Sequence, residues 1–272
     1  MDDQSDDGSE NSRYNFVIYF FSFFCFCFNF FFSFYFSICS DMSFSAYNGR
    51  RLESTGRIIE KLKSQAWTDR KEGLANLLAV FRESQSCREL DIAQLKELSD
   101  IFHRMLIDNQ IKSYSLVLNV LNEFIQIYAK QLDYWLYPLM TRLFVKLNND
   151  ILGSIQTRIL KTLELIRECF PIVDQFNSIM KLISDTRHSL QNKARTIALQ
   201  HLSKIIFRMD AIDFTYDKVN NHEITATLKR ILYMSSDPKS NELRKICEET
   251  IINLYHLNNT QMTLYINSLE PM

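Results

Sequence analysis

Residues 112–129 have the sequence KSYSLVLNVLNEFIQIYA, in which apolar side chains recur at intervals of three and four positions. This spacing places the apolar side chains on one face of a helix with 3.6 residues per turn. The apolar face comprises Leu116, Val117, Val120, Leu121, Phe124, Ile125 and Tyr128. The stretch therefore predicts an amphipathic helix that packs this face against neighbouring elements.

The same spacing continues along the chain in both directions. Residues 152–169 repeat it with Ile155, Ile159, Leu160, Leu163 and Ile166, and with Phe170 just beyond. No segment shows the sustained two-residue alternation that is typical of strands. We expect helices at 51–64, 68–84, 91–107, 112–129, 132–147, 152–169, 172–185, 190–208, 220–235, 239–256 and 260–269. The predicted fold class is all-α.

The expected helices fall into pairs, with a short polar connection inside each pair. Basic residues in the first turns of the second helices are Lys71, Lys112, Arg158, Lys193 and Arg244. They lie on average about 43 residues apart, close to the ~40–47-residue period of HEAT and armadillo repeats. One pair cannot bury its own apolar face, so successive pairs stack into an α-solenoid. The connections, with Asp and Asn as expected helix caps, then line up along one edge as a recognition surface.

Composition excludes several other classes of protein. Only 5 Gly and 4 Pro occur among 272 residues, which argues against collagen, β-sandwiches and the glycine-rich phosphate loops of nucleotide-binding enzymes. The six cysteines form neither a disulfide framework nor a zinc-binding set, and the five histidines are isolated. We expect His201 on a helix surface, and we expect no metal and no cofactor.

The first 50 residues differ from the rest. Residues 1–15 are acidic and predict disorder, and residues 40–50 are expected to be a linker. Residues 16–39, FVIYFFSFFCFCFNFFFSFYFSIC, form an uncharged apolar run of transmembrane length. The same Phe/Ser/Cys composition is also typical of a translated non-coding stretch joined to a real coding region, so an anchor and a gene-model artefact both stay open.

Trp67 lies at the first expected intra-pair connection. Thr68 or Asp69 can cap the helix that follows, which places the indole at the edge of the connection. Trp67 is then either a hydrophobic staple against the first helical turn or an exposed aromatic anchor for a partner.

Several motifs together resemble the TOG domains of CLASP proteins, most closely the third TOG domain. They are WTDRKEGL at 67–74, LDYWL at 132–136, DILGSIQ at 150–156, RECFP at 167–171 with DQFN at 174–177, and DPKS at 237–240 with RK at 244–245. The resemblance covers about residues 55–270 and implies six HEAT repeats, of which the last is cut short here. We expect the domain to span 51–272.

The resemblance implies a microtubule-associated module with no enzymatic activity. Its expected partners are tubulin, microtubules and other plus-end proteins, with no nucleic acid, and with a membrane only if residues 16–39 are an anchor. Its expected location is the cytoplasm and the microtubule cytoskeleton, including spindle and kinetochore. Carried over by position, the tubulin-binding residues are Trp67, Lys71, Ile111, Lys112, Ser154, Arg158, Lys193, Arg195, Lys239 and Arg244.

Two other classes of function compete with this hypothesis. A generic HEAT-repeat scaffold with a non-tubulin partner explains the same pattern, because basic residues at helix starts are often only solvated. An enzyme is disfavoured, since the sequence has no metal-binding motif on a helix, no nucleophile elbow and no glycine-rich loop.

Overall fold

The computed structural model describes residues 54–83, 90–107, 111–149, 153–188 and 190–269, without the side chains of residues 111–113. These residues belong to one compact unit, 52–272. The acidic segment 1–15, the Phe-rich segment 16–39 and the linker 40–50 lie outside the described residues. Their predicted roles, and the boundaries of the domain, stay predictions.

The described chain is helical, and no strand occurs within the ranges above. The α-helices are α2 (Thr55–Lys63), α3 (Trp67–Arg82), α4 (Ile92–Met105), α5 (Ile111–Tyr128), α6 (Asp133–Asn149), α7 (Gly153–Cys169), α8 (Ile172–Ser184), α9 (Asn192–Ile206), α10 (Asn221–Ser235), α11 (Asn241–Leu257) and α12 (Asn259–Asn267). Each expected helix is present, with ends that differ by a few residues. The all-α prediction is confirmed.

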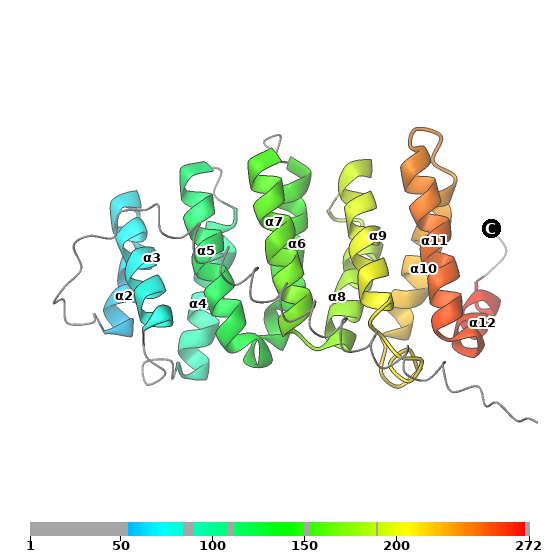
Figure 1. Ribbon diagram of the computed structural model, residues 1–272, viewed down its shortest axis with the longest axis horizontal. Helices are drawn as coiled ribbons and strands as arrows, with labels where there is room; N and C mark the ends of the chain where they lie inside the picture. Colours follow the sequence, from blue (N-terminus) through cyan, green and yellow to red (C-terminus); the bar gives the residue numbers. More distant parts are fainter. Residues whose placement is uncertain (1–53, 84–89, 108–110, 150–152, 189, 270–272) are drawn as a thin grey trace, which may run out of the picture. The chain divides into compact units, whose positions relative to one another are not determined.

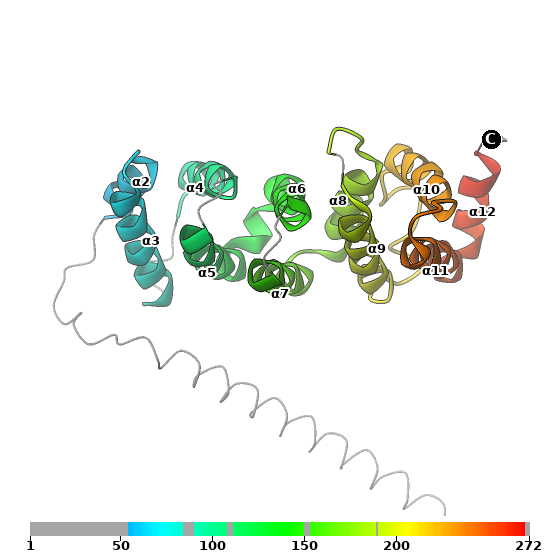
Figure 2. The same ribbon diagram turned by 90° about the horizontal axis from the view of Figure 1, so that it is seen from above.

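The helices stack as antiparallel pairs in two layers. Figure 2 shows α2, α4, α6, α8 and α10 in one row and α3, α5, α7, α9 and α11 in the other. Contacts within the pairs and between like helices of successive pairs hold the stack together. Helix α12 follows α11 and packs against it at the end of the described stack (Figure 1). This is the HEAT-repeat solenoid that the sequence period predicts.

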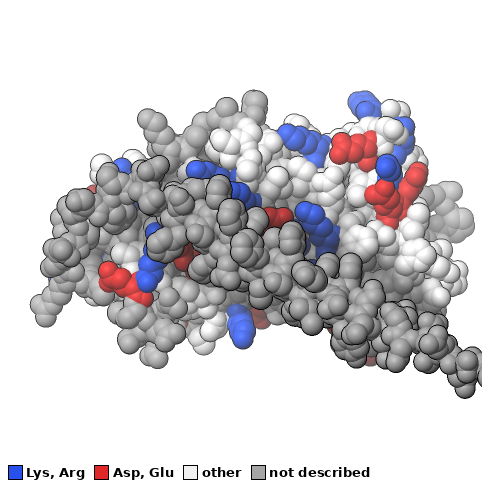
Figure 3. Space-filling view, viewed as in Figure 1, with Lys and Arg blue, Asp and Glu red and all other residues white. Residues whose placement is uncertain are grey.

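The two ends of the helices form two different edges. Helices α2, α4, α6, α8 and α10 end, and their partners begin, along the upper edge in Figure 1, which we name the loop edge. Connections between successive pairs lie at the lower edge. Lys and Arg side chains recur over the upper part of the face in Figure 3, with acidic side chains between them.

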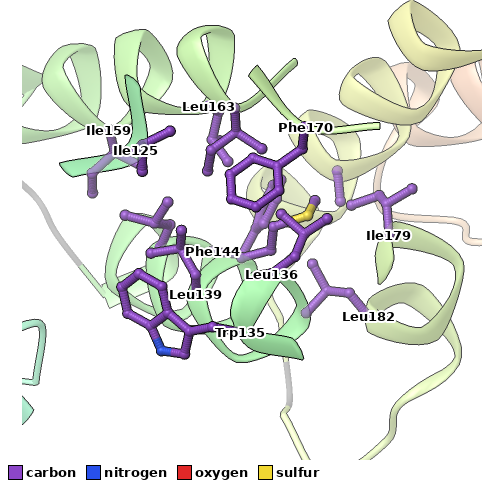
Figure 4. Close-up of a cluster of buried hydrophobic side chains, with 14 of the residues drawn as sticks. Ile125, Trp135, Leu136, Leu139, Phe144, Ile159, Leu163, Phe170, Ile179 and Leu182 are labelled. Atoms are coloured by element: carbon purple, nitrogen blue, oxygen red, sulfur yellow. The ribbon is translucent and has the colours of Figure 1, made fainter. Parts of the chain in front are cut away.

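The core follows the apolar period of the helices, except that Leu160, which the sequence places on the apolar face of α7, is 41% exposed. Figure 4 shows Ile125, Phe144, Leu163 and Leu182, from α5, α6, α7 and α8, turned toward one another. All four are at most 1% exposed. Burial of each such side chain stabilises the fold by about 1.5–3 kcal/mol, so contacts between pairs carry most of the stability.

The capping pattern differs from the expectation. Asp91, Asn220 and Asn258 cap α4, α10 and α12 by accepting hydrogen bonds from backbone N–H groups. These three caps lie at connections between pairs, and Ser240 at the start of α11 is the side-chain cap described on the loop edge. At the described helix starts of the loop edge, those of α3, α9 and α11, the prediction of Asp and Asn caps is therefore wrong. The residues that precede α5 and α7 lie outside the described ranges, so it stays a prediction there. A polar side chain satisfies free N–H groups at either end of a pair, so the residue type does not determine the edge.

His201 is also not where the sequence places it. Its side chain is 4% exposed in α9 and lies edge-to-face with Phe144, with the two ring centroids 6.0 Å apart. Its Nδ1 accepts a hydrogen bond from Arg167 at 3.0 Å. Burial, with the charge of Arg167, lowers the pKa of His201 to about 3, so the imidazole is neutral. The expected surface position is wrong because α7 approaches the polar face of α9 here.

Within the described ranges, no helix is both long enough and apolar enough to cross a membrane. The same residues contain no group of three or more His, Cys, Asp or Glu side chains that could hold a metal ion.

Candidate functional site

The first connection of the loop edge places Trp67 at the start of α3. Ala66 takes the N-cap position and makes no side-chain cap. Asp69 instead accepts a hydrogen bond from the Ser64 hydroxyl at 2.7 Å, so the expected cap by Thr68 or Asp69 is wrong. The chain thus enters the helix two residues before Thr68 and three before Asp69.

The Trp67 indole is half-buried and packs against the hydrophobic core. The guanidinium carbon of Arg70 lies 5.5 Å from the centroid of its ring, within the range of a cation–π contact. Arg70 also donates to the backbone carbonyls of Ser64 and Gln65, which closes the connection between α2 and α3. The indole is thus held rigidly, with part of its surface open at the edge.

The second and third connections are only partly described. Helix α5 begins at Ile111, but the side chains of Ile111 and Lys112 lie outside the described residues. In the first turns of α7, Ser154 and Arg158 are both exposed. Lys71 in α3 is likewise exposed, so the loop edge presents basic side chains from different pairs.

The fourth connection is fastened to the preceding pair. Asp185, whose side chain is 7% exposed, accepts hydrogen bonds from the Tyr137 hydroxyl at 2.8 Å and from two nitrogens of Arg187. These donors hold the pKa of the Asp185 carboxyl well below its usual range, so it stays ionised. The backbone N–H of Gln191 donates to Asn148 of α6 at 2.6 Å. The turn between α8 and α9 is therefore fixed from both sides.

The two predicted bases of α9 have different environments. Lys193 is exposed and donates from Nζ to Gln156 Oε1 of α7 at 2.8 Å. Arg195 is half-buried and points into a hollow between α8, α9 and α10. Burial and the charge of Arg230 lower the pKa of Arg195. The sequence missed Arg230 because it lies in the body of α10 rather than in a connection.

In the fifth connection, the predicted bases again differ. Lys239 is exposed, and its backbone N–H donates to Asp237 Oδ1 at 2.7 Å. Arg244 is half-buried and donates to the Asp237 carbonyl at 2.8 Å and to Asn241 Oδ1 at 3.2 Å. Arg244 thus braces the turn into α11.

The described loop edge therefore combines a rigid, half-buried indole with exposed bases on separate pairs. Among the bases predicted from the sequence, those exposed are Lys71, Arg158, Lys193 and Lys239. Such an edge can bind a large acidic surface by charge complementarity, with the indole as an apolar contact at one end.

Sequence comparison identifies the domain. No family model matches the chain. The chain is 33% identical over 240 residues, 86% of its length, to CLIP-associating protein 1 of Xenopus tropicalis. It is 35% identical over 216 residues, 79% of its length, to CLIP-associating protein of Drosophila melanogaster. The described helices form a TOG domain of the CLIP-associating protein (CLASP) family.

Solved structures agree on the fold of this CLASP TOG domain. A TOG domain from work on TOG–tubulin binding specificity superposes with a TM-score of 0.56 at 14% identity, over 79% of this chain and 77% of that one. The N-terminal domain of MAST/Orbit gives 0.52 at 10% identity, over 77% and 93%. The chain spans only 16% and 14% of the length of the Xenopus and Drosophila relatives.

Proposed function

We propose that this CLASP TOG domain binds tubulin through the loop edge and that the protein regulates microtubule dynamics without enzymatic activity. The observation that carries the proposal is the half-buried Trp67 on the same edge as exposed bases of several other pairs. We place the protein in the cytoplasm, on microtubules, the spindle and kinetochores, where CLASP-type stabilisation and rescue take place.

The expected binding energies assign different roles to the exposed bases and to the Trp67 indole. Each exposed ion pair with an acidic partner adds about 0–1 kcal/mol and weakens with salt, so the bases mainly steer and orient the partner. An aromatic side chain that becomes fully covered contributes more, typically about 2 kcal/mol or above at a hot spot. One domain alone should bind weakly, and several linked binding sites would strengthen the interaction through effective concentration.

Replacement of Trp67 tests the proposed edge. We expect Trp67→Ala to lower tubulin affinity by about tenfold or more, because the aromatic contact of the edge is lost. Binding is measured by fluorescence anisotropy with labelled tubulin and by co-elution in size exclusion. Trp67→Phe, which keeps an apolar ring against the core, should retain part of the affinity and shows whether a loss stems from misfolding.

Phe207→Ala is the matched control. Phe207 is 77% exposed and follows α9 at the opposite edge, so its removal should leave tubulin binding unchanged. Equal affinities of Trp67→Ala and wild type, or equal losses in both alanine variants, would reject the loop edge as the binding surface. Wild-type protein that captures another protein from lysate but no tubulin would favour the generic scaffold.

A further inference from the structure

A polar groove lies between the first turns of α9 and α11, at the loop edge. It measures about 360 Å³, which is within the range of ~300–1,000 Å³ that is typical of ligand clefts. Its lining consists of Lys193, Thr196, Ile197 and Gln200 of α9 with Ser240 and Glu242 of α11. The groove therefore lies directly beside Lys193, one of the predicted tubulin contacts.

The acidic side chain of this lining has no counter-charge. Glu242 is exposed in the first turn of α11 and forms no ion pair within the described part of the chain. The bases that follow it in α11 have other partners. Arg244 donates to the Asp237 carbonyl at 2.8 Å, and Lys245 pairs with Glu249 at 3.7 Å. The carboxylate of Glu242 is therefore free to accept hydrogen bonds from a ligand.

The basic side chain of the lining is directed to the other side of α9. Lys193 donates from Nζ to Gln156 of α7 at 2.8 Å, and Figure 2 shows α7 and α11 on opposite sides of α9. The exposed Lys239 lies on the same edge but is not part of the lining. The groove thus offers the charge of Glu242 in the middle of a basic edge.

Two α9 residues of the lining offer a hydroxyl and an apolar surface. Thr196 is 5% exposed, and its hydroxyl has no hydrogen-bond partner among the residues that the structure describes. Buried polar groups are normally hydrogen-bonded, so this hydroxyl suits a ligand in the groove. Its neighbour Ile197 is half-buried and packs against the core, with part of its surface in the groove.

A lysine or arginine side chain matches this lining. Its methylene stem is apolar and its head is a cation with several N–H donors. The stem can lie on Ile197 while the head donates to the Glu242 carboxylate and to the Thr196 hydroxyl.

We propose that the groove between α9 and α11 takes a Lys or Arg side chain of bound tubulin, with Glu242 as its counter-charge. This proposal rests on the proposed function. It makes one point of the interface opposite in charge to the rest of the loop edge, and such an inverted pair fixes the register of a partner more than it adds affinity.

The first arm of the test measures cation binding in the full chain without tubulin. The protein is titrated with N-acetylarginine amide, and backbone amide signals are followed by NMR. We expect the signals of Gln200 and Glu242 to shift saturably in wild type and at least threefold less in Glu242→Gln. N-acetylnorleucine amide, which has an apolar stem and no charge, should shift them little. Equal shifts in wild type and Glu242→Gln would overturn the groove as a cation site.

The second arm measures tubulin affinity. We expect Glu242→Gln to weaken binding at least threefold. A uniformly basic edge predicts the opposite sign, because removal of an acid strengthens attraction to an acidic partner. Glu248→Gln is the matched control, since Glu248 is exposed further along α11 and outside the lining, and it should bind at least as tightly as wild type.

Thr196→Val separates binding from folding. We expect it to weaken tubulin binding at least twofold and to melt no lower than wild type, because it removes a hydroxyl that has no partner. A lower melting temperature would assign the hydroxyl a structural role and contradict its part in the groove.

Unchanged or tighter tubulin binding by Glu242→Gln would overturn the tubulin side chain as the occupant. If wild type fails to bind tubulin, the proposed function fails, and the titration with N-acetylarginine amide still decides whether the groove binds the cation.

Discussion

At the scale of single residues, the charged side chains of this domain have two distinct roles. Exposed bases such as Lys71 and Lys239 are free to meet a partner. Others, such as Asp185 and Arg244, use their hydrogen bonds to shape the connections that carry those bases. A basic residue in the right sequence position is thus insufficient evidence for a contact, because its hydrogen-bond partners decide its role.

Asp185→Asn should expose the stabilising role of that carboxylate. Because the folded pKa of Asp185 lies below its unfolded value of about 3.8, its contribution is complete above pH 4 and is lost as the pH falls further. We expect the variant to lose about 1–3 kcal/mol of unfolding free energy at pH 7. Urea denaturation from pH 7 down to pH 2 should show the two proteins converging in acid. If the difference in unfolding free energy between wild type and Asp185→Asn stayed constant across that pH range, the stabilising role of the Asp185 carboxylate would be contradicted.

At the scale of helices, close approach of α2 and α3 explains a glycine inside α3. A Cβ on Gly73 would lie 3.0 Å from Cδ2 and 3.2 Å from Cγ of Leu62, which is 3% exposed. Glycine in a helix costs about 1 kcal/mol relative to alanine. The packing of this first pair therefore outweighs helix propensity at this position.

Gly73→Ala should consequently destabilise the domain despite its better helix propensity. Overpacking costs about 1–3 kcal/mol, so we expect a net loss of about 1 kcal/mol in the free energy of unfolding, measured by urea denaturation. Gly56→Ala is the matched control, since a Cβ there meets nothing within 4 Å and should stabilise α2 slightly. Stabilisation by both substitutions would show that α2 can move away from α3.

At the scale of the whole helical stack, each pair is stabilised by its contacts with the neighbouring pairs. The junction between the third pair (α6 and α7) and the fourth pair (α8 and α9) is distinctive. Helices α6 and α8 pack through apolar side chains, whereas α7 and α9 are joined by Arg167–His201 and by Lys204 with Glu164 at 3.8 Å. Phe144 fills the interior of this junction (Figure 4). The apolar contacts of α6 therefore carry most of the coupling between the two halves of the stack.

Phe144→Ala should weaken that coupling. We expect a loss of about 3–5 kcal/mol in unfolding free energy. In a stack with nearest-neighbour contacts, we also expect amide hydrogen exchange to rise most in α6 and α9 and least in α3. Tyr216→Ala, at a residue 66% exposed, should change stability by less than about 0.5 kcal/mol. A uniform rise in exchange along the domain would show that the halves unfold together.

The amino-acid sequence by itself determined the helices, their pairing and the edge on which the connections lie. Apolar positions with a period of 3.6, as in 112–129, report which face each helix buries, and this information is local. Only the tertiary structure decided that His201 is buried, that Arg244 braces its own turn and that Arg195 and Arg230 line the same hollow. These outcomes depend on the offset between neighbouring pairs, which brings polar side chains of different helices together and which no periodicity within one helix encodes.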